Sequence, residues 1–143
     1  MPTPFESADL ILKLYEIRRE ETMRKARDFM MGFDPKTFEE FQAASMGPQN
    51  AYIRMAYGYW EMAASFVTNG AIDAKMFDEA NAEHISAFAK IEPYVGQFRS
   101  MLGAPNFLKN LEKVCYELPG PKERVAQTRE RQRMMAAAMA KRG

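Results

Sequence analysis

The stretch that decides the fold runs from Gln49 to Asn69 and reads QNAYIRMAYGYWEMAASFVTN. Apolar residues cover most of the circumference of this segment when it is drawn as a helix, and only a narrow stripe is polar: Arg54, Gly58, Glu61, Ser65 and Thr68. A helix that is apolar nearly all round must be surrounded by other elements. We therefore predict that residues 49–69 form the central helix of the fold, with Trp60 buried.

Turn-forming residues divide the rest of the chain into further segments. These breaks fall at Gly32, Asp34-Pro35, Gly47-Pro48, Asn69-Gly70, Pro93, Gly103-Ala104-Pro105 and Pro119-Gly120-Pro121. Between the breaks, apolar residues recur at helical spacing. The sequence has no run of alternating β-branched residues, which argues against a sheet. The pattern predicts an all-α fold, a compact bundle of five to seven helices.

Capping residues predict where several of these helices begin and end. Ser7 is the expected N-cap of a first helix that reaches about residue 31. Asp34 is expected to cap a short helix over residues 35–45, and Asp73 a fourth helix. Pro93 is expected to end or kink that fourth helix, because proline has no N–H to donate. Further helices are predicted over residues 94–102 and 105–118.

Length and composition favour one globular domain and exclude several classes of site. The chain has 143 residues, of which 47% are hydrophobic, which suits a single packed core. A single cysteine, Cys115, and a single histidine, His84, exclude an intramolecular disulfide and a zinc site of the HExxH type. No phosphate loop or nucleophile elbow is present, so we expect no catalytic residues, no metal and no cofactor. No secretory signal or membrane-spanning stretch is visible, which predicts a cytoplasmic protein without membrane insertion.

Four polar residues are candidates for a buried ion pair or a small pocket: Arg18, Arg54, Glu61 and His84. Arg18 falls within the apolar arc of the first helix, and His84 falls on the apolar stripe of the fourth. The favoured interpretation is structural, with the charged residues in an ion pair that fixes helix register and His84 hydrogen-bonded in the core. A ligand pocket near Arg18, Arg54 and Glu61 is the alternative. Without a nucleophile or base beside them, these residues specify no reaction.

The C-terminal segment departs from the composition of the rest of the chain. Residues 122–143 hold seven basic and two acidic residues, a net charge of +5, whereas residues 1–121 carry −4. We therefore predict a globular domain over 1–121 and a semi-detached basic helix over 122–143 that packs little against the core. Its candidate partner-binding residues are Arg124, Arg129, Arg131, Arg133, Met134, Met135 and Met139. Three interpretations stay open: a solvated helix without a ligand, a helix that docks on an acidic protein surface, or contact with nucleic acid.

Residues 51–114 resemble a bacterial family of all-helical domains of unknown function. The resemblance depends on the Trp60-Glu61 pair, the turn from Asn69 to Asp73, the break from Ile91 to Tyr94, and Arg99 shortly after it. The resemblance implies a helical fold and brings no activity with it.

Methionine content favours a role in protein interaction. Twelve methionines occur in the chain, and methionine suits surfaces that adapt to imperfectly shaped partners. We therefore predict a non-enzymatic protein-interaction domain that binds a protein partner or forms a homo-oligomer. Nucleic-acid association through the basic helix and small-molecule binding are the alternatives.

Overall fold

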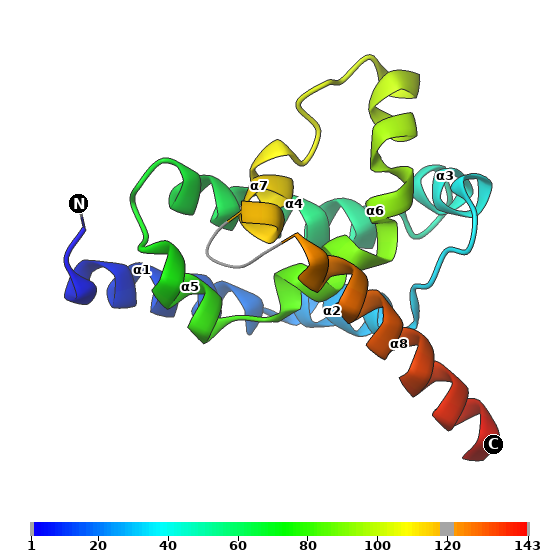
Figure 1. Ribbon diagram of the computed structural model, residues 1–143, viewed down its shortest axis with the longest axis horizontal. Helices are drawn as coiled ribbons and strands as arrows, with labels where there is room; N and C mark the ends of the chain where they lie inside the picture. Colours follow the sequence, from blue (N-terminus) through cyan, green and yellow to red (C-terminus); the bar gives the residue numbers. More distant parts are fainter. Residues whose placement is uncertain (1, 118–121, 143) are drawn as a thin grey trace.

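The computed structural model describes residues 2–117 and 122–142, which form helices joined by loops (Figure 1). The helices are α1 (Pro4–Arg18), α2 (Glu21–Gly32), α3 (Phe38–Met46), α4 (Asn50–Thr68), α5 (Ala74–Ala80), α6 (Glu83–Leu102), α7 (Lys109–Glu117) and α8 (Glu123–Arg142). No strand occurs within these residues, so the predicted all-α class is confirmed. The described part of the chain holds eight helices instead of five to seven.

Helix α4 packs against α2, α3, α5, α6 and α7. Its buried side chains include Ile53, Tyr57 and Trp60, and Trp60 keeps only 2% of its surface exposed, as predicted. The Trp60 ring lies edge-on to Tyr59 at 4.8 Å and to Phe77 of α5 at 6.4 Å. These contacts follow from the apolar surface that surrounds most of α4, because such a surface is stable only when other elements cover it.

The predicted first helix is two helices in the structure, and Ser7 is not its N-cap. Thr3 caps α1 in a reciprocal capping box with Glu6, while Ser7 is fully buried and its hydroxyl accepts from the Asp73 backbone N–H at 3.0 Å. The chain then adopts an extended conformation at Glu20. The Glu20 carboxylate accepts hydrogen bonds from two backbone N–H groups in the first turn of α2. These hydrogen bonds lower the pKa of Glu20. The two residues between α1 and α2 hardly disturb the helical spacing of apolar residues, which explains why the sequence pattern does not predict this boundary.

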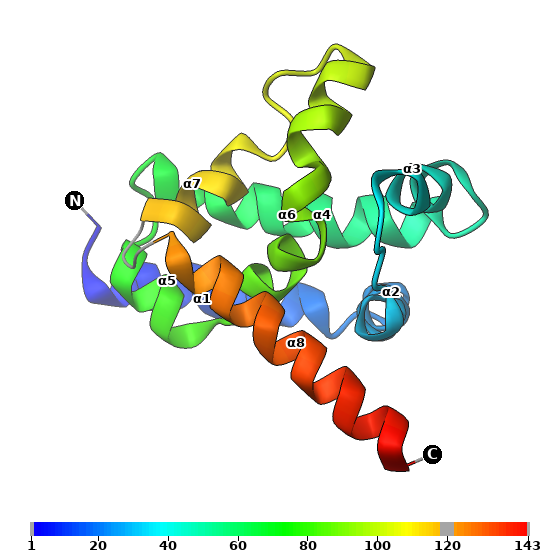
Figure 2. The same ribbon diagram turned by 45° about the vertical axis from the view of Figure 1, so that its right-hand side comes forward.

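The second and fourth predicted helices also have different limits. Helix α3 begins at Phe38 with Thr37 as its cap, so the predicted cap at Asp34 is wrong. Asp73 does cap α5, but that helix ends at Ala80 because Asn81 adopts an extended conformation. Pro93 lies inside α6, which continues to Leu102 and changes direction along its length (Figure 2).

None of the helices among residues 2–117 and 122–142 combines the length and apolar character that crossing a bilayer requires.

Candidate functional site

The first half of α8, residues 123–132, lies against α6 and α7 and is called the docked half below. Val125 is fully buried and Thr128 keeps 6% of its surface exposed. The Gln132 side chain donates to the Ser86 carbonyl oxygen at 2.9 Å. The prediction that the basic helix packs little against the core is therefore wrong for this half.

Arg124 joins the docked half to the C-terminal end of α7. Its guanidinium donates to the carbonyl oxygens of Val114 at 3.1 Å and Cys115 at 3.3 Å, and it pairs with Asp78 of α5 at 2.6 Å. The last carbonyls of a helix lack intrahelical partners and carry the negative end of its dipole. Arg124 thus stabilises α7 and ties three helices together.

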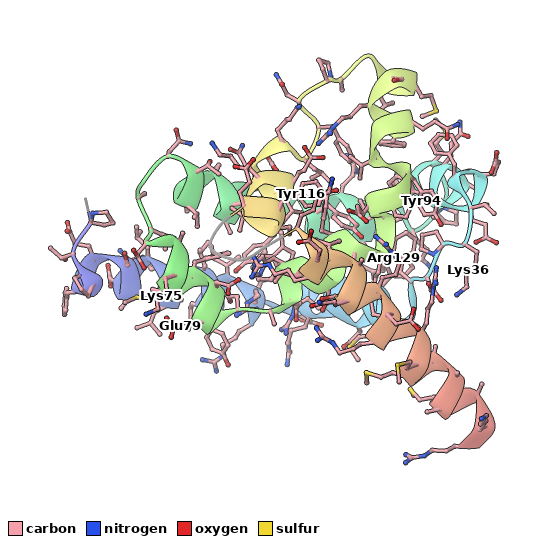
Figure 3. The ribbon with its side chains drawn as sticks, viewed as in Figure 1. Lys36, Lys75, Glu79, Tyr94, Tyr116 and Arg129 are labelled. Carbon is pink, nitrogen blue, oxygen red and sulfur yellow. The ribbon has the colours of Figure 1, made fainter. Side chains whose placement is uncertain are left out.

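Arg129 supplies the hydrogen bond that Pro93 cannot make. Because proline has no N–H, the carbonyl of Ala89 four residues earlier in α6 loses its helical donor. The Arg129 Nε–H donates to this carbonyl oxygen at 3.0 Å. The same guanidinium pairs with Glu92, which also accepts from the Tyr116 hydroxyl at 2.6 Å. Arg129 therefore lies where α6 and α8 are in contact (Figure 3) and satisfies the carbonyl that Pro93 leaves without a helical donor.

The second half of α8, residues 133–142, is exposed at every position and is called the free half. It extends beyond the rest of the molecule (Figure 1). Met134, Met135 and Met139 expose 64%, 66% and 70% of their surface. At 100° per residue these three side chains and Ala138 fall within an arc of about 140°. The free half is thus a helix with an apolar side that nothing in the described chain covers.

Arg131 and Arg133 of α8 make only local contacts among the described residues. Arg131 donates to the Thr128 hydroxyl at 3.2 Å, and Arg133 pairs with Glu130 at 3.8 Å with both side chains more than 60% exposed. Exposed pairs of this kind contribute little to stability. These arginines can therefore change partners at small cost.

A second exposed helix face lies on α1. Phe5 and Leu12 expose 83% and 65% of their surface, and Asp9 and Glu16 are exposed beside them. These four side chains fall within an arc of about 60° at helical spacing. Asp9 pairs with Lys13 at 3.1 Å, and Glu16 lies 3.6 Å from an arginine one turn on, both with exposed side chains. We call these four residues the outer face of α1; it combines apolar and acidic groups.

His84 is fully buried, as predicted, but the core gives it no hydrogen bond. Its ring lies 5.0 Å from the Phe77 ring and 5.6 Å from the Trp60 ring, between centroids. Neither ring nitrogen has a hydrogen-bond partner among the described residues. Burial lowers the pKa of His84 to about 4. The imidazole is therefore neutral near pH 7, and no described residue accepts or donates a hydrogen bond at either ring nitrogen.

Arg18 lies near His84 but apart from the other candidate residues. Its guanidinium carbon is 5.3 Å from the centre of the Trp60 ring, and one terminal nitrogen donates to Asn81 at 3.3 Å. Glu83 lies 4.0 Å away and is held more closely by Arg27, at 2.9 Å. Arg18 therefore connects α1 to the junction of α5 and α6.

Arg54 and Glu61 line the same cavity but do not pair with each other. The Glu61 carboxylate accepts from the Asn110 and Leu111 backbone N–H groups at 3.2 and 2.9 Å and from the Asn110 side chain at 2.8 Å. Glu61 thus occupies the N-terminus of α7, where the helix dipole favours an anion. Arg54 is exposed at the rim of the cavity. Gly58, which the sequence analysis did not single out as a site residue, lines the cavity between them.

The described residues include no group of three or more histidine, cysteine, aspartate or glutamate side chains that could hold a metal ion. Cys115 is buried, and burial raises the pKa of its thiol to about 12, so it stays protonated. A thiol is a weak nucleophile compared with its thiolate. Neither His84 nor Cys115 is therefore activated for catalysis by its surroundings.

Comparison with known proteins places the body of the chain in a family. The sequence model of a family described as a domain of unknown function (DUF4760) matches residues 4–118. The predicted resemblance to a family of helical domains of unknown function is therefore confirmed over a longer range than expected, whereas the bacterial origin of that family stays a prediction. Helix α8 begins beyond the matched range. No curated protein and no solved structure matches the chain.

Proposed function

The chain belongs to this family of domains of unknown function, and we propose that it is a non-enzymatic protein-interaction domain whose contact surface is the free half of α8. One observation carries the proposal: residues 133–142 are helical, yet every one of them is exposed. A helix gains most of its stability from packing an apolar face, and short unpacked helices are marginal in water. The three exposed methionines provide a face that can adapt to a partner.

The partner that fits best is a second copy of the chain. The free half combines methionines with Arg133, Lys141 and Arg142, while the outer face of α1 combines Phe5 and Leu12 with two carboxylates. Apolar groups on the two faces can pack together while opposite charges meet around them. The lengths also match, at about 15 Å for the free half and about 17 Å from Phe5 to Glu16, from the rise of 1.5 Å per residue.

The positions of these two faces determine what kind of assembly they form. The N-terminus of α1 and the C-terminal end of α8 lie at opposite ends of the molecule in both views (Figures 1 and 2). Two copies placed antiparallel bring each free half to the outer face of α1 on the other copy. Such a pair is closed by a two-fold axis, whereas a head-to-tail arrangement leaves both ends open. We therefore propose a reciprocal dimer.

Nucleic-acid association has less support from the geometry than protein contact. Arg124 and Arg129 are engaged by Asp78, Glu92 and backbone carbonyl oxygens. Nucleic-acid affinity scales with the number of cations that reach phosphates. Four cations are left on α8: Arg131, Arg133, Lys141 and Arg142. The last three belong to the free half with its three methionines, which suit a protein surface better.

The test is the mass of the purified protein in solution, measured by sedimentation velocity over a range of concentrations. The wild type is expected to sediment as a dimer that dissociates on dilution. Met139→Glu in the free half and Leu12→Glu on α1 are each expected to give a monomer, because each removes one side of both contacts. Met31→Glu is the matched control, since Met31 is 83% exposed on α2 and belongs to neither face.

Mixing the two monomeric variants distinguishes this arrangement from other dimers. In the mixture, the free half of the Leu12→Glu chain meets an unchanged α1 on the Met139→Glu chain. One of the two contacts is then restored, so a weaker heterodimer should form. A wild type that stays monomeric at all concentrations, or variants that keep its mass, would contradict the proposed assembly.

A further inference from the structure

A second open feature of the fold is a cavity. It lies between α3, α4, the end of α6 and residues 106–108. Its volume is about 550 Å³, within the range of about 300–1,000 Å³ typical of small-molecule sites. The walls are mainly apolar and aromatic and include Phe41, Ile53, Tyr57, Phe98, Phe107 and Leu108. Such a lining suits the hydrocarbon part of a small ligand.

Gly58 leaves one wall of this cavity open. It lies in the middle of α4, where glycine costs about 0.5–1 kcal/mol of stability relative to alanine. A Cβ atom added at this position would meet no atom within 4 Å. Packing therefore does not require glycine here, and any larger side chain would reduce the space in the cavity.

The charged groups at the cavity favour an anion over a cation. Glu61 is already occupied by the backbone N–H groups of α7. Arg54 has no hydrogen bond or ion pair with any residue among 2–117 and 122–142. It lies one turn before Gly58, and residues four apart share a helix face. The rim of the cavity thus presents one available guanidinium beside the open wall.

We propose that this cavity binds a small amphipathic carboxylate, such as a medium-chain fatty acid. The hydrocarbon chain lies between Phe41, Tyr57 and Phe98, in the space beside Gly58, and the carboxylate accepts hydrogen bonds from the Arg54 guanidinium. A guanidinium presents two parallel N–H donors to a carboxylate, which makes this pairing stronger than one between neutral groups. The site is separate from the free half of α8, so its test does not depend on the proposed dimer.

The test uses decanoate, below the concentration at which it forms micelles, titrated into the full chain by isothermal calorimetry. Gly58→Leu is expected to abolish binding, because its side chain occupies the cavity, while the melting temperature stays the same or rises. Gly96→Ala is the matched control: Gly96 also lies inside a helix with open space at its Cβ, and it does not line the cavity. This control should keep wild-type affinity.

Two further measurements separate recognition of the ligand's carboxylate from burial of its hydrocarbon chain. Arg54→Gln is expected to weaken decanoate binding about tenfold or more, as loss of a charged hydrogen bond does, and to leave decanol binding unchanged. The free half of α8 is the other apolar segment that could occupy the cavity. If it did, Met139→Glu would change decanoate binding; we expect decanoate binding to stay unchanged. A wild type that does not bind decanoate, or a Gly58→Leu variant that binds it as the wild type does, would overturn the proposal.

Discussion

The two halves of α8 carry three basic residues each but lie in opposite environments. In the docked half, Arg124 and Arg129 reach carbonyl oxygens and carboxylates of α5, α6 and α7. In the free half, every side chain from 133 to 142 is exposed. The two halves of α8 therefore have different structural roles, although both are basic. What distinguishes the halves is whether the body of the protein offers acceptors and an apolar surface within reach.

Two truncations test this comparison most strongly. At a protein concentration below the dimer dissociation constant, removing residues 133–143 should leave the free energy of unfolding within about 0.5 kcal/mol of the wild type, as is usual for exposed positions. Removing residues 122–143 also takes away Val125, Arg124 and Arg129, and should leave a chain that does not fold cooperatively. Chemical denaturation followed by circular dichroism measures both. If the two truncations behave alike, the boundary between the halves is wrong.

The second prediction concerns the link between Arg129 and Pro93. Arg129→Met should destabilise the protein by about 3 kcal/mol, because it leaves Glu92 without its cation and the Ala89 carbonyl without a donor. Arg133→Met in the free half is the control and should change the stability of the monomer by less than about 0.5 kcal/mol. In the double variant with Glu92→Gln, part of the loss should be recovered. Equal effects of the two arginine substitutions would contradict the structural role of Arg129.

The third prediction uses His84, whose surroundings include the charges of Asp78 and Arg124. Burial lowers its pKa to about 4 in the folded protein, against about 6.5 for a histidine exposed to water. The unfolded chain therefore binds more protons between these values, and the stability present above pH 6.5 is lost as the pH falls toward 4. The loss should reach roughly 3 kcal/mol at pH 4.

His84→Leu supplies the matched measurement for this pH dependence. The variant should lose the part of the pH dependence between pH 6.5 and 4 that His84 contributes. At pH 7 it should be more stable than the wild type by about 1 kcal/mol, because the unpaired ring nitrogens of His84 cost free energy when buried. Lys141→Gln in the free half should leave the pH profile of the wild type unchanged. A variant with the wild-type slope between pH 6.5 and 4 would rule out His84 as its origin.

The sequence predicts the features that depend on local pattern and misses those that depend on distant partners. The apolar circumference of residues 49–69 correctly predicts the burial of Trp60, and the stripe that contains His84 correctly places it in the core. The hydrogen bond to the Ala89 carbonyl, which Pro93 cannot supply, comes from Arg129, 36 positions after the proline. No local rule contains that contact.

The sequence contains a weak indication that α8 is divided into two halves, although its basic composition alone does not show it. Val125, Thr128 and Gln132 are spaced by three and four residues, so they form a short stripe that ends where the free half begins. For the candidate site, Arg54 and Glu61 are seven residues apart and share a helix face, which is why both reach one cavity. The pairing of Glu61 with α7 needed the tertiary fold, because α7 starts nearly fifty residues later.

Paired truncations of apolar side chains compare the two halves of α8 at the level of single residues. Val125→Ala removes two methyl groups from a fully buried position and should cost about 2 kcal/mol, from lost burial and the cavity left behind. Met139→Ala removes a larger side chain that is 70% exposed, so in the monomer it should change stability by less than about 0.5 kcal/mol. Urea denaturation at a protein concentration below the dimer dissociation constant measures both changes.

At higher concentration Met139→Ala should become destabilising, because only the dimer covers that side chain and partner binding adds to stability by mass action. A cost for Met139→Ala that does not change with concentration would place this side chain against its own domain and remove the distinction between the two halves.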